Sequence, residues 1–246
     1  MLLLLSIGLG VWYFFYKPSS SLTSNNESSP VAELTNETPS PKITTNPMES
    51  FATALFASDY KVTSSGKFDV IKQDDSSTVT SSLDLNNGTI YLKKGAVVKI
   101  ENNDADMNTT VYRNGTDLYV ISPDQKTYSI LESSNSIYSF FDSIFVASYP
   151  LIPLLEDTQQ GIVTWQKNSN NEWQADWAWK TPFDLTDINV QVKVSLDSET
   201  GLITTLYMKF EGSDQWQEGT FVYEKIENID SLLTTPSDYT KEDSGF

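Results

Sequence analysis

The sequence contains no cysteine and no histidine among its 246 residues. Without cysteine there is no disulfide, no thiolate metal ligand, no cysteine nucleophile and no acylated cysteine of the kind that anchors bacterial lipoproteins. Without histidine the chain lacks the commonest general base and the commonest zinc ligand. Serine–lysine or paired-carboxylate catalysis stays open, but no spacing of these residues singles out a nucleophile.

Basic residues are also scarce, since 16 lysines and arginines face 33 acidic residues and leave a net charge of −17. Nucleic-acid binding depends on clusters of basic side chains, so we expect no nucleic-acid partner. A glycine-rich phosphate loop is missing too. Asp104 and Asp106 imitate the start of a calcium loop, but Thr109 stands where that loop needs glycine. We therefore expect a protein that is not an enzyme and binds neither metal nor cofactor.

The N-terminal apolar run is slightly short for a membrane span. Residues 2–16 read LLLLSIGLGVWYFFY and are followed by Lys17, whereas a spanning helix needs about 17 to 25 such residues. The aromatic cluster suits the interfacial end of a spanning helix, and the basic start and small-residue cleavage site of a signal peptide are missing. Residues 1–17 therefore predict a single-pass membrane anchor whose helix begins before Met1. An uncleaved or unusually cleaved signal-like segment is the alternative.

Residues 18–47 are rich in Ser, Thr, Asn, Glu and Pro. This composition buries too little apolar surface to offset chain entropy, so the segment is interpreted as a disordered linker. A membrane segment followed by such a linker predicts that residues 48–246 form a domain held off the membrane surface, outside the cytoplasm.

The domain is expected to begin with a short helix. Asn46 suits the N-cap, Pro47 the first helical position and Glu49 the third position of a capping box. Phe51 and Leu55 belong to its apolar stripe.

Strand-like segments occupy most of the remaining chain. Their alternating apolar and polar residues predict a meander of antiparallel strands. The triplet Asn-Asn-Gly at 86–88 predicts a hairpin between the second and third of them. The expected strands are residues 60–73, 77–85, 89–101, 108–113, 117–122, 126–131, 160–167, 172–180, 190–196, 202–210 and 216–226.

The stretch 172–223 has the largest apolar face. Trp173, Ala175, Trp177 and Trp179 alternate with polar residues, and the two strands that follow keep the same period. Such a pattern is typical of a half-buried antiparallel sheet. Each tryptophan taken singly is expected in an ordinary core, but one long apolar face with few helices to cover it also favours a lined cavity.

An apolar insertion interrupts the meander at residues 136–157. Phe140, Phe141, Ile144 and Phe145 have helical spacing, and the two prolines at 150 and 153 end or kink the helix. We expect this insertion to pack onto the apolar face of the sheet.

The order of these elements resembles the LolA/LppX superfamily of bacterial lipoprotein-carrier and lipid-carrier proteins. The similar phrases are VYRNGTDLYVISP at 111–123, LDSETGLI at 196–203 and PSDY at 236–239, and the resemblance covers residues 48–240. It implies a mainly β (α+β) fold: an unclosed β-barrel, a curved antiparallel sheet with helices covering its concave face. The implied function is to shield acyl chains in a hydrophobic cavity.

This resemblance predicts a membrane-anchored domain in the bacterial cell envelope that binds a lipid or the acyl chain of a lipoprotein. Because the chain is tethered and has no cysteine to acylate, we expect local binding or sensing rather than long-range transport. The alternative is a protein-interaction or envelope-sensing module with a filled core. The residues expected to line the cavity are Trp173, Trp177, Trp179, Leu206, Met208 and Phe210 from the sheet and Phe140, Phe141, Phe145 and Tyr149 from its cover.

Overall fold

The structure, a computed structural model, describes residues 46–74, 77–86, 88–104, 107–168, 172–180 and 187–242. The expected membrane segment 1–17 and the linker up to residue 45 lie outside these residues. The part from Asn46 to Phe246 forms a compact unit of its own.

The first described helix, α2, spans Pro47–Ala57 and begins where the sequence predicts. The side chain of Asn46 accepts a hydrogen bond from the backbone N–H of Met48 at 2.9 Å, which satisfies one of the free donors at the helix start. Met48, Phe51 and Leu55 form its buried face, each with no more than 1% of its surface exposed. The cap and the apolar stripe together fix which side of α2 packs on the sheet.

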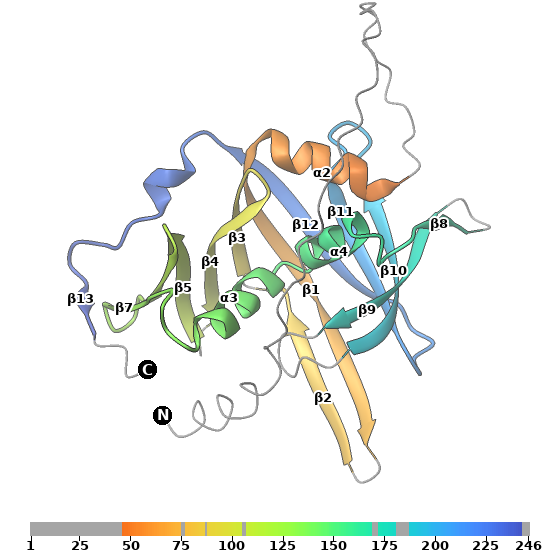
Figure 1. Cartoon of the computed structure of the whole chain (residues 1–246), viewed down its shortest axis with the longest axis horizontal. Coiled ribbons are helices and arrows are strands. Elements are labelled where there is room, and N and C mark those ends of the chain that lie inside the picture. Colours follow the sequence, from red (N-terminus) through yellow and green to blue (C-terminus); the bar gives the residue numbers. More distant parts are fainter. Residues whose placement is uncertain are drawn as a thin grey trace, which may run out of the picture. The chain divides into compact units, whose positions relative to one another are not determined.

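The described strands form one large unclosed, curved sheet, which confirms the predicted fold class (Figure 1). Its strand order is β13-β7-β6-β5-β4-β3-β1-β12-β11-β10-β9-β8, with β2 paired to β1. All pairs are antiparallel except β13 with β7. The strands are β1 Asp59–Asp74, β2 Ser77–Asp84, β3 Gly88–Lys93, β4 Ala96–Asp104, β5 Met107–Asn114, β6 Asp117–Ser122, β7 Thr127–Leu131, β8 Gln166–Lys167, β9 Trp173–Lys180, β10 Asp187–Leu196, β11 Ile203–Phe210, β12 Gln217–Ile226 and β13 Thr240–Lys241.

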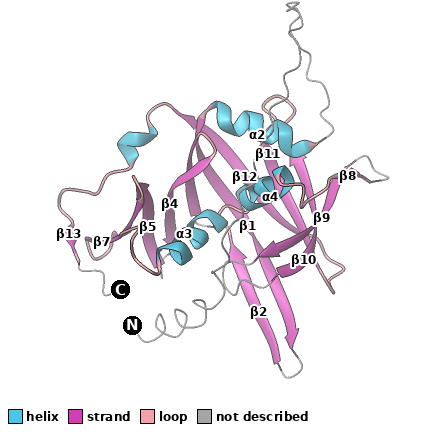
Figure 2. Cartoon of the chain, viewed as in Figure 1, coloured by secondary structure: helices cyan, strands magenta, loops and turns pink. Residues whose placement is uncertain are grey.

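Three helices lie on one face of the sheet (Figure 2). α2 is joined there by α3, Tyr138–Ala147, and α4, Leu151–Gln159, which together form the predicted apolar insertion. Buried side chains from α2, α4 and the sheet belong to one hydrophobic cluster. This face is therefore the concave face on which the sequence predicts a helical cover.

The segment predicted as one strand at 89–101 is two strands, and this prediction was wrong. A tight turn at Lys94 and Gly95 separates β3 from β4, and both turn residues have positive φ, 47° and 85°. Gly95 lies against the ring of Phe56, so a Cβ at this position would come within 2.3 Å of that ring. The Lys-Lys-Gly sequence gave a weaker turn signal than the Asn-Gly pairs elsewhere.

The predicted hairpin at 86–88 does not form either. β2 pairs with residues 67–74 of β1, whereas β3 pairs with residues 60–63 of the same strand and with β4. At 16 residues, β1 is long enough to carry β2 and β3 one after the other along one edge. The backbone N–H of Leu85 bonds to the carbonyl oxygen of Gly66 at 2.9 Å and continues the β2 ladder.

The predicted strand at 160–167 is reduced to the two residues of β8. α4 runs to Gln159, and the carbonyl oxygen of Asp157 accepts hydrogen bonds from the N–H groups of Ile162 and Val163. These bonds fold the chain back at the end of the helix, which uses the residues that the sequence assigned to the strand.

The C-terminal segment packs on the opposite, convex face. The 3-10 helix η1, Ile229–Leu232, forms a second small cluster with Tyr91 and Val98. The segment continues to β13, which pairs with β7 through residues 240 and 241.

Candidate ligand-binding face

The concave face of β9–β11 is densely packed. Trp179 has 1% of its surface exposed and lies between Trp177 and Phe210, with ring centroids 6.1 Å away in both cases. Leu206 and Met208 on β11 have no exposed surface at all. A side chain with no surface open to water does not line a void large enough for a water molecule. This half of the face is a filled core in the structure.

Helix α4 is tied to this core by two indole hydrogen bonds. The Nε1–H of Trp177 donates to the carboxylate of Asp157 at 2.7 Å, and the Nε1–H of Trp165 donates to the hydroxyl of Thr158 at 3.1 Å. Both acceptors lie on the last turn of α4. A buried indole N–H without a partner is costly, so these bonds fix the position of the helix over β9.

A tyrosine pair fixes the start of the same helix. The hydroxyls of Tyr149 and Tyr223 lie 2.6 Å apart, and Tyr223 donates to the carbonyl oxygen of Ile203 at 2.9 Å. Tyr149 therefore donates to Tyr223. Burial raises the pKa of both tyrosines well above the ordinary value, so both hydroxyls stay protonated at neutral pH.

Arg113 of β5 makes the charged contact with helix α3. One guanidinium nitrogen donates to the carboxylate of Asp142 and the other donates to the hydroxyl of Tyr138 at 3.1 Å. The same guanidinium lies over the ring of Phe145, 5.6 Å from its centroid. Phe145 is the buried residue of this helix. Arg113 and the buried Phe145 thus connect α3 to the sheet beneath it, and Phe141 and Val146 pack against the same core from partly exposed positions.

Apolar side chains on both sides of this contact stay partly exposed. Those on the sheet, Ile100, Val111 and Val120, are paired neighbours on β4, β5 and β6, and they lie on the face that carries Arg113. Their helix members belong to α3. We call this set the α3 strip; it consists of Ile100, Val111, Val120, Phe140, Phe141 and Ile144, all of intermediate burial.

The structure distributes the residues predicted to line a cavity over these two halves. Trp177, Trp179, Leu206, Met208, Phe210, Phe145 and Tyr149 are at most 5% exposed and belong to one hydrophobic cluster. Trp173 is half-buried, beneath the ammonium of Lys167 at 5.1 Å. Phe140 and Phe141 belong to the α3 strip and meet edge to face at 5.4 Å. Their role in ligand binding stays a prediction.

Sequence reasoning missed Arg113, Asp142 and Asp157, which position the covering helices. Two of them carry a signal in the sequence: Arg113 is the only arginine, and Asp142 is the only charged residue between positions 136 and 155. A lone charge in an apolar segment needs a partner when the segment is buried. That reasoning pairs Asp142 with a cation, but the sequence alone does not choose Arg113 among the available cations.

A separate hollow of about 670 Å³ lies on the convex side of β9–β11 and at the turn after β11. Its outward side chains include Asp176, Asn189, Gln191, Lys209 and Glu211. Two hydrogen bonds join them: Asn189 to Glu211 at 3.1 Å and Gln191 to Asp176 at 3.4 Å. This hollow carries charged and amide side chains and lies on the face away from the predicted acyl-chain site.

The described residues include no group of three or more acidic side chains placed to hold a metal ion. They also include no single helix that is long and apolar enough to cross a membrane, although α3 and α4 together pass on length and composition with a bend of 97° between them.

No family model matches the sequence, and no curated protein matches it. Solved structures give distant likenesses. An uncharacterized conserved protein from Thermus thermophilus is 7% identical, with a TM-score of 0.42 over 80% of this chain and 96% of that one. The MucA/MucB complex of Pseudomonas aeruginosa contains a chain that is 12% identical, with a TM-score of 0.35 over 78% of this chain. The chain spans 61% of that protein's length.

Proposed function

We propose that this domain binds the acyl chain of a lipid or lipoprotein between α3 and the concave face of β4–β6. The observation that carries the proposal is the α3 strip, in which the helix and the sheet both leave apolar surface partly exposed. Burying an acyl chain there contributes about 0.8 kcal/mol per CH₂ group. Ten buried groups are then enough for about 8 kcal/mol before the costs of ordering are subtracted.

The attachment of α3 supports this location over the tryptophan-rich half. α4 is held by hydrogen bonds at both ends and by a row of buried leucines, so a ligand beneath it has to displace a filled core. α3 has one fully buried residue, Phe145, and one charged anchor, Arg113, whereas Phe141 and Val146 pack against the core but stay partly exposed. A helix with so little fully buried surface opens at a lower free-energy cost. The acyl chain enters as α3 moves away from β4 and β5.

A titration with the fluorescent fatty acid cis-parinaric acid tests this proposal. The protein is residues 46–246, which form a compact unit, and native mass spectrometry after incubation with phosphatidylglycerol gives the stoichiometry. We expect saturable binding of one lipid. Phe140→Asp places a charge in the α3 strip and should weaken binding at least about tenfold, the effect of burying an unpaired charge. The matched control is Phe56→Asp on α2, since Phe56 is 50% exposed outside the strip.

A second function is favoured by a different observation. Leu206, Met208 and Tyr149 have no exposed surface, as a protein-interaction or envelope-sensing module with a filled core requires. For that function we expect a mass free of lipid before and after incubation, and equal fluorescence for the wild type and Phe140→Asp. This result would overturn the acyl-chain proposal.

A further inference from the structure

The end of β1 projects from the sheet as a two-stranded arm with β2 (Figure 1). Residues 59–66 of β1 pair with β12 on one edge, but this pairing ends where Gly66 meets Gly219. Gly66 has a φ of +118°, and a Cβ there would lie 2.2 Å from the carbonyl oxygen of Glu218, so only glycine fits where the strands separate. Among the described residues, no strand pairs with this edge of β1 from 67 to 74.

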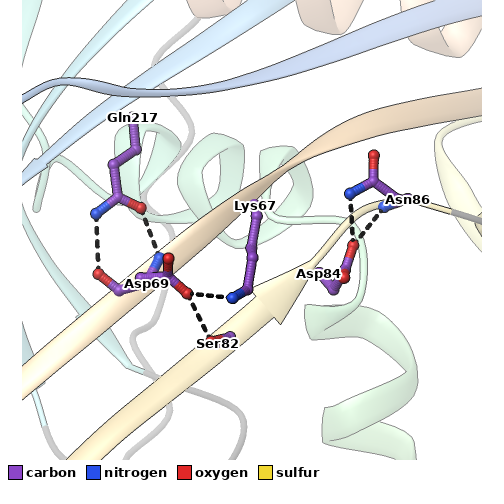
Figure 3. Close-up of polar contacts among 6 residues, drawn as sticks. All are labelled: Lys67, Asp69, Ser82, Asp84, Asn86 and Gln217. Carbon is purple, nitrogen blue, oxygen red and sulfur yellow. Dashed lines mark hydrogen bonds and ion pairs between the residues drawn. The ribbon is translucent and has the colours of Figure 1, made fainter.

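The side chain of Gln217 occupies the first position along that open edge (Figure 3). Its Oε1 accepts a hydrogen bond from the backbone N–H of Asp69 at 2.5 Å, and its Nε2 donates to the backbone carbonyl of Asp69 at 2.9 Å. A residue of a neighbouring strand makes these same two bonds. The Gln217 amide thus takes the place of a peptide group where β12 no longer pairs with β1.

Side-chain contacts hold the base of the arm in place. Lys67 and Asp69 form an ion pair at 2.8 Å, and the hydroxyl of Ser82 donates to the carboxylate of Asp69 at 2.6 Å. On the other strand, Asn86 donates to Asp84 from its backbone N–H and its side-chain amide. Of these contacts, the hydrogen bond between Ser82 and Asp69 joins β1 to β2 at the base, and the others order each strand end by itself.

The hydrogen-bond alternation shows which residues of β1 offer backbone groups to that edge. The carbonyl oxygen of Gly66 accepts from Leu85, so Gly66 faces β2, whereas the N–H and C=O of Asp69 face Gln217. Alternate residues of a strand face the same edge. Ile71 and Gln73 therefore point their backbone donors and acceptors in the same direction as Asp69.

We propose that this edge of β1 binds an extended, basic segment of a partner protein, which adds as a strand beside Ile71 and Gln73. An extended peptide adds as a strand to a sheet edge whose backbone groups are unpaired, and such an edge begins here beyond the side-chain amide of Gln217. The net charge of −17 disfavours a second copy of the chain, and the acidic side chains of Asp84 and Glu218 near the base favour a basic occupant, whereas the charge of Asp69 is paired with Lys67. This site is distinct from the α3 strip, so it stands whether or not the domain binds lipid.

The test measures binding of a fluorescent decapeptide of alternating valine and lysine to the full-length chain by anisotropy. Ile71→Pro removes the N–H that faces the open edge and leaves the N–H groups that bond to β2. We expect about tenfold weaker binding for this variant, the loss of one main-chain hydrogen bond. Ile71→Val keeps the N–H and is the matched control, which should bind like the wild type. Equal binding by the wild type and Ile71→Pro would overturn the proposal.

Hydrogen exchange locates the peptide and checks the arm. We expect the peptide to protect the amides of Ile71 and Gln73. Protection of Thr78 and Thr80 instead would place the peptide on the outer edge of β2 and contradict the proposal. The amides of Val70 and Lys72 should stay protected in Ile71→Pro; if they do not, Gln73→Pro serves as the variant.

Two further outcomes identify a different occupant of the edge. A dimer in sedimentation that Ile71→Pro disrupts would mean that a second copy binds there. If the wild type does not bind the peptide, a basic segment does not bind at this edge and the proposal is wrong. Replacing every lysine of the peptide by glutamate should abolish binding, and a glutamate peptide that binds equally well would contradict the role of charge.

Discussion

The two halves of the concave face carry similar amounts of apolar sequence but bury it to different degrees. Beneath α4, the inward side chains in the middle of β9–β11 are at most 7% exposed, and hydrogen bonds from Trp177 and Tyr149 fix the helix. Beneath α3, the sheet and the helix both keep partly exposed apolar residues, and one arginine makes the charged connection. The difference separates a part of the domain that is filled from a part whose apolar surface is incompletely covered.

The largest effect should come from the densely packed half. Trp179→Ala leaves a large cavity between Trp177 and Phe210, so we expect the free energy of unfolding to fall by about 3–5 kcal/mol. Phe140→Ala in the α3 strip should cost less, about 1–2 kcal/mol, since its side chain is partly exposed. Urea denaturation followed by tryptophan fluorescence measures both. Equal losses would remove the distinction between the two halves.

Removing the hydrogen bond between Trp177 and Asp157, which anchors α4, should have the next largest effect on the free energy of unfolding. Asp157→Ala leaves the buried Nε1–H of Trp177 without its acceptor, so we expect a loss of about 1–3 kcal/mol in the free energy of unfolding. The double variant with Trp177→Phe should lose less than the sum of the single changes, because the two side chains act through one hydrogen bond. Strictly additive losses in a double-mutant cycle would show that this bond does not fix the helix.

Arg113→Met should release α3 and leave the rest of the fold intact. We expect a loss of about 1 kcal/mol in the free energy of unfolding, because the ion pair with Asp142 is partly open to solvent. Hydrogen exchange of the α3 amides should become faster, while the α4 amides stay protected. An unchanged rate in α3, or an equal increase in both helices, would contradict the separate opening of α3.

The smallest effect concerns pH. Burial, and then the nearby charge of Asp157, raises the pKa of Glu156. A carboxyl whose pKa is higher in the folded protein stabilises the fold while it is protonated, and this contribution is lost as the pH rises through the folded-state value. Glu156→Gln should therefore be slightly more stable than the wild type at pH 7 and equal to it near about pH 4. Melting temperatures at the two pH values measure the difference, and a constant difference would exclude this cause.

Much of the fold could be predicted from the sequence because its signals are local. The alternation of Trp173 to Trp179 identifies the face that is buried, and Asn46 with Pro47 marks the start of α2. Errors came where a signal was weak or depended on a distant partner. The Lys-Lys-Gly sequence at 93–95 is a weak turn signal, so the two strands on either side of it were predicted as one.

Other features could not be predicted because they depend on pairing between distant segments. β2 and β3 lie end to end along β1, and the Asn-Gly signal between them is compatible with either a hairpin or this arrangement. The insertion that the sequence singled out does cover the sheet, but the division between a filled half and a partly exposed half depends on side-chain packing. That division follows from which helix Arg113, Asp157 and Tyr149 hold.

The sequence by itself determined the class of fold, the apolar face of each strand and the exclusion of cysteine and histidine chemistry, because composition and period are properties of the chain alone. Only the tertiary structure decided where the long β1 leaves β12, which backbone groups then lie at an open edge and which helix covers its face loosely. These depend on contacts across more than a hundred residues, such as that between Gln217 and Asp69, 148 positions apart. No local pattern carries that information, because the open edge exists only where β12 separates from β1 while β2 stays paired with it.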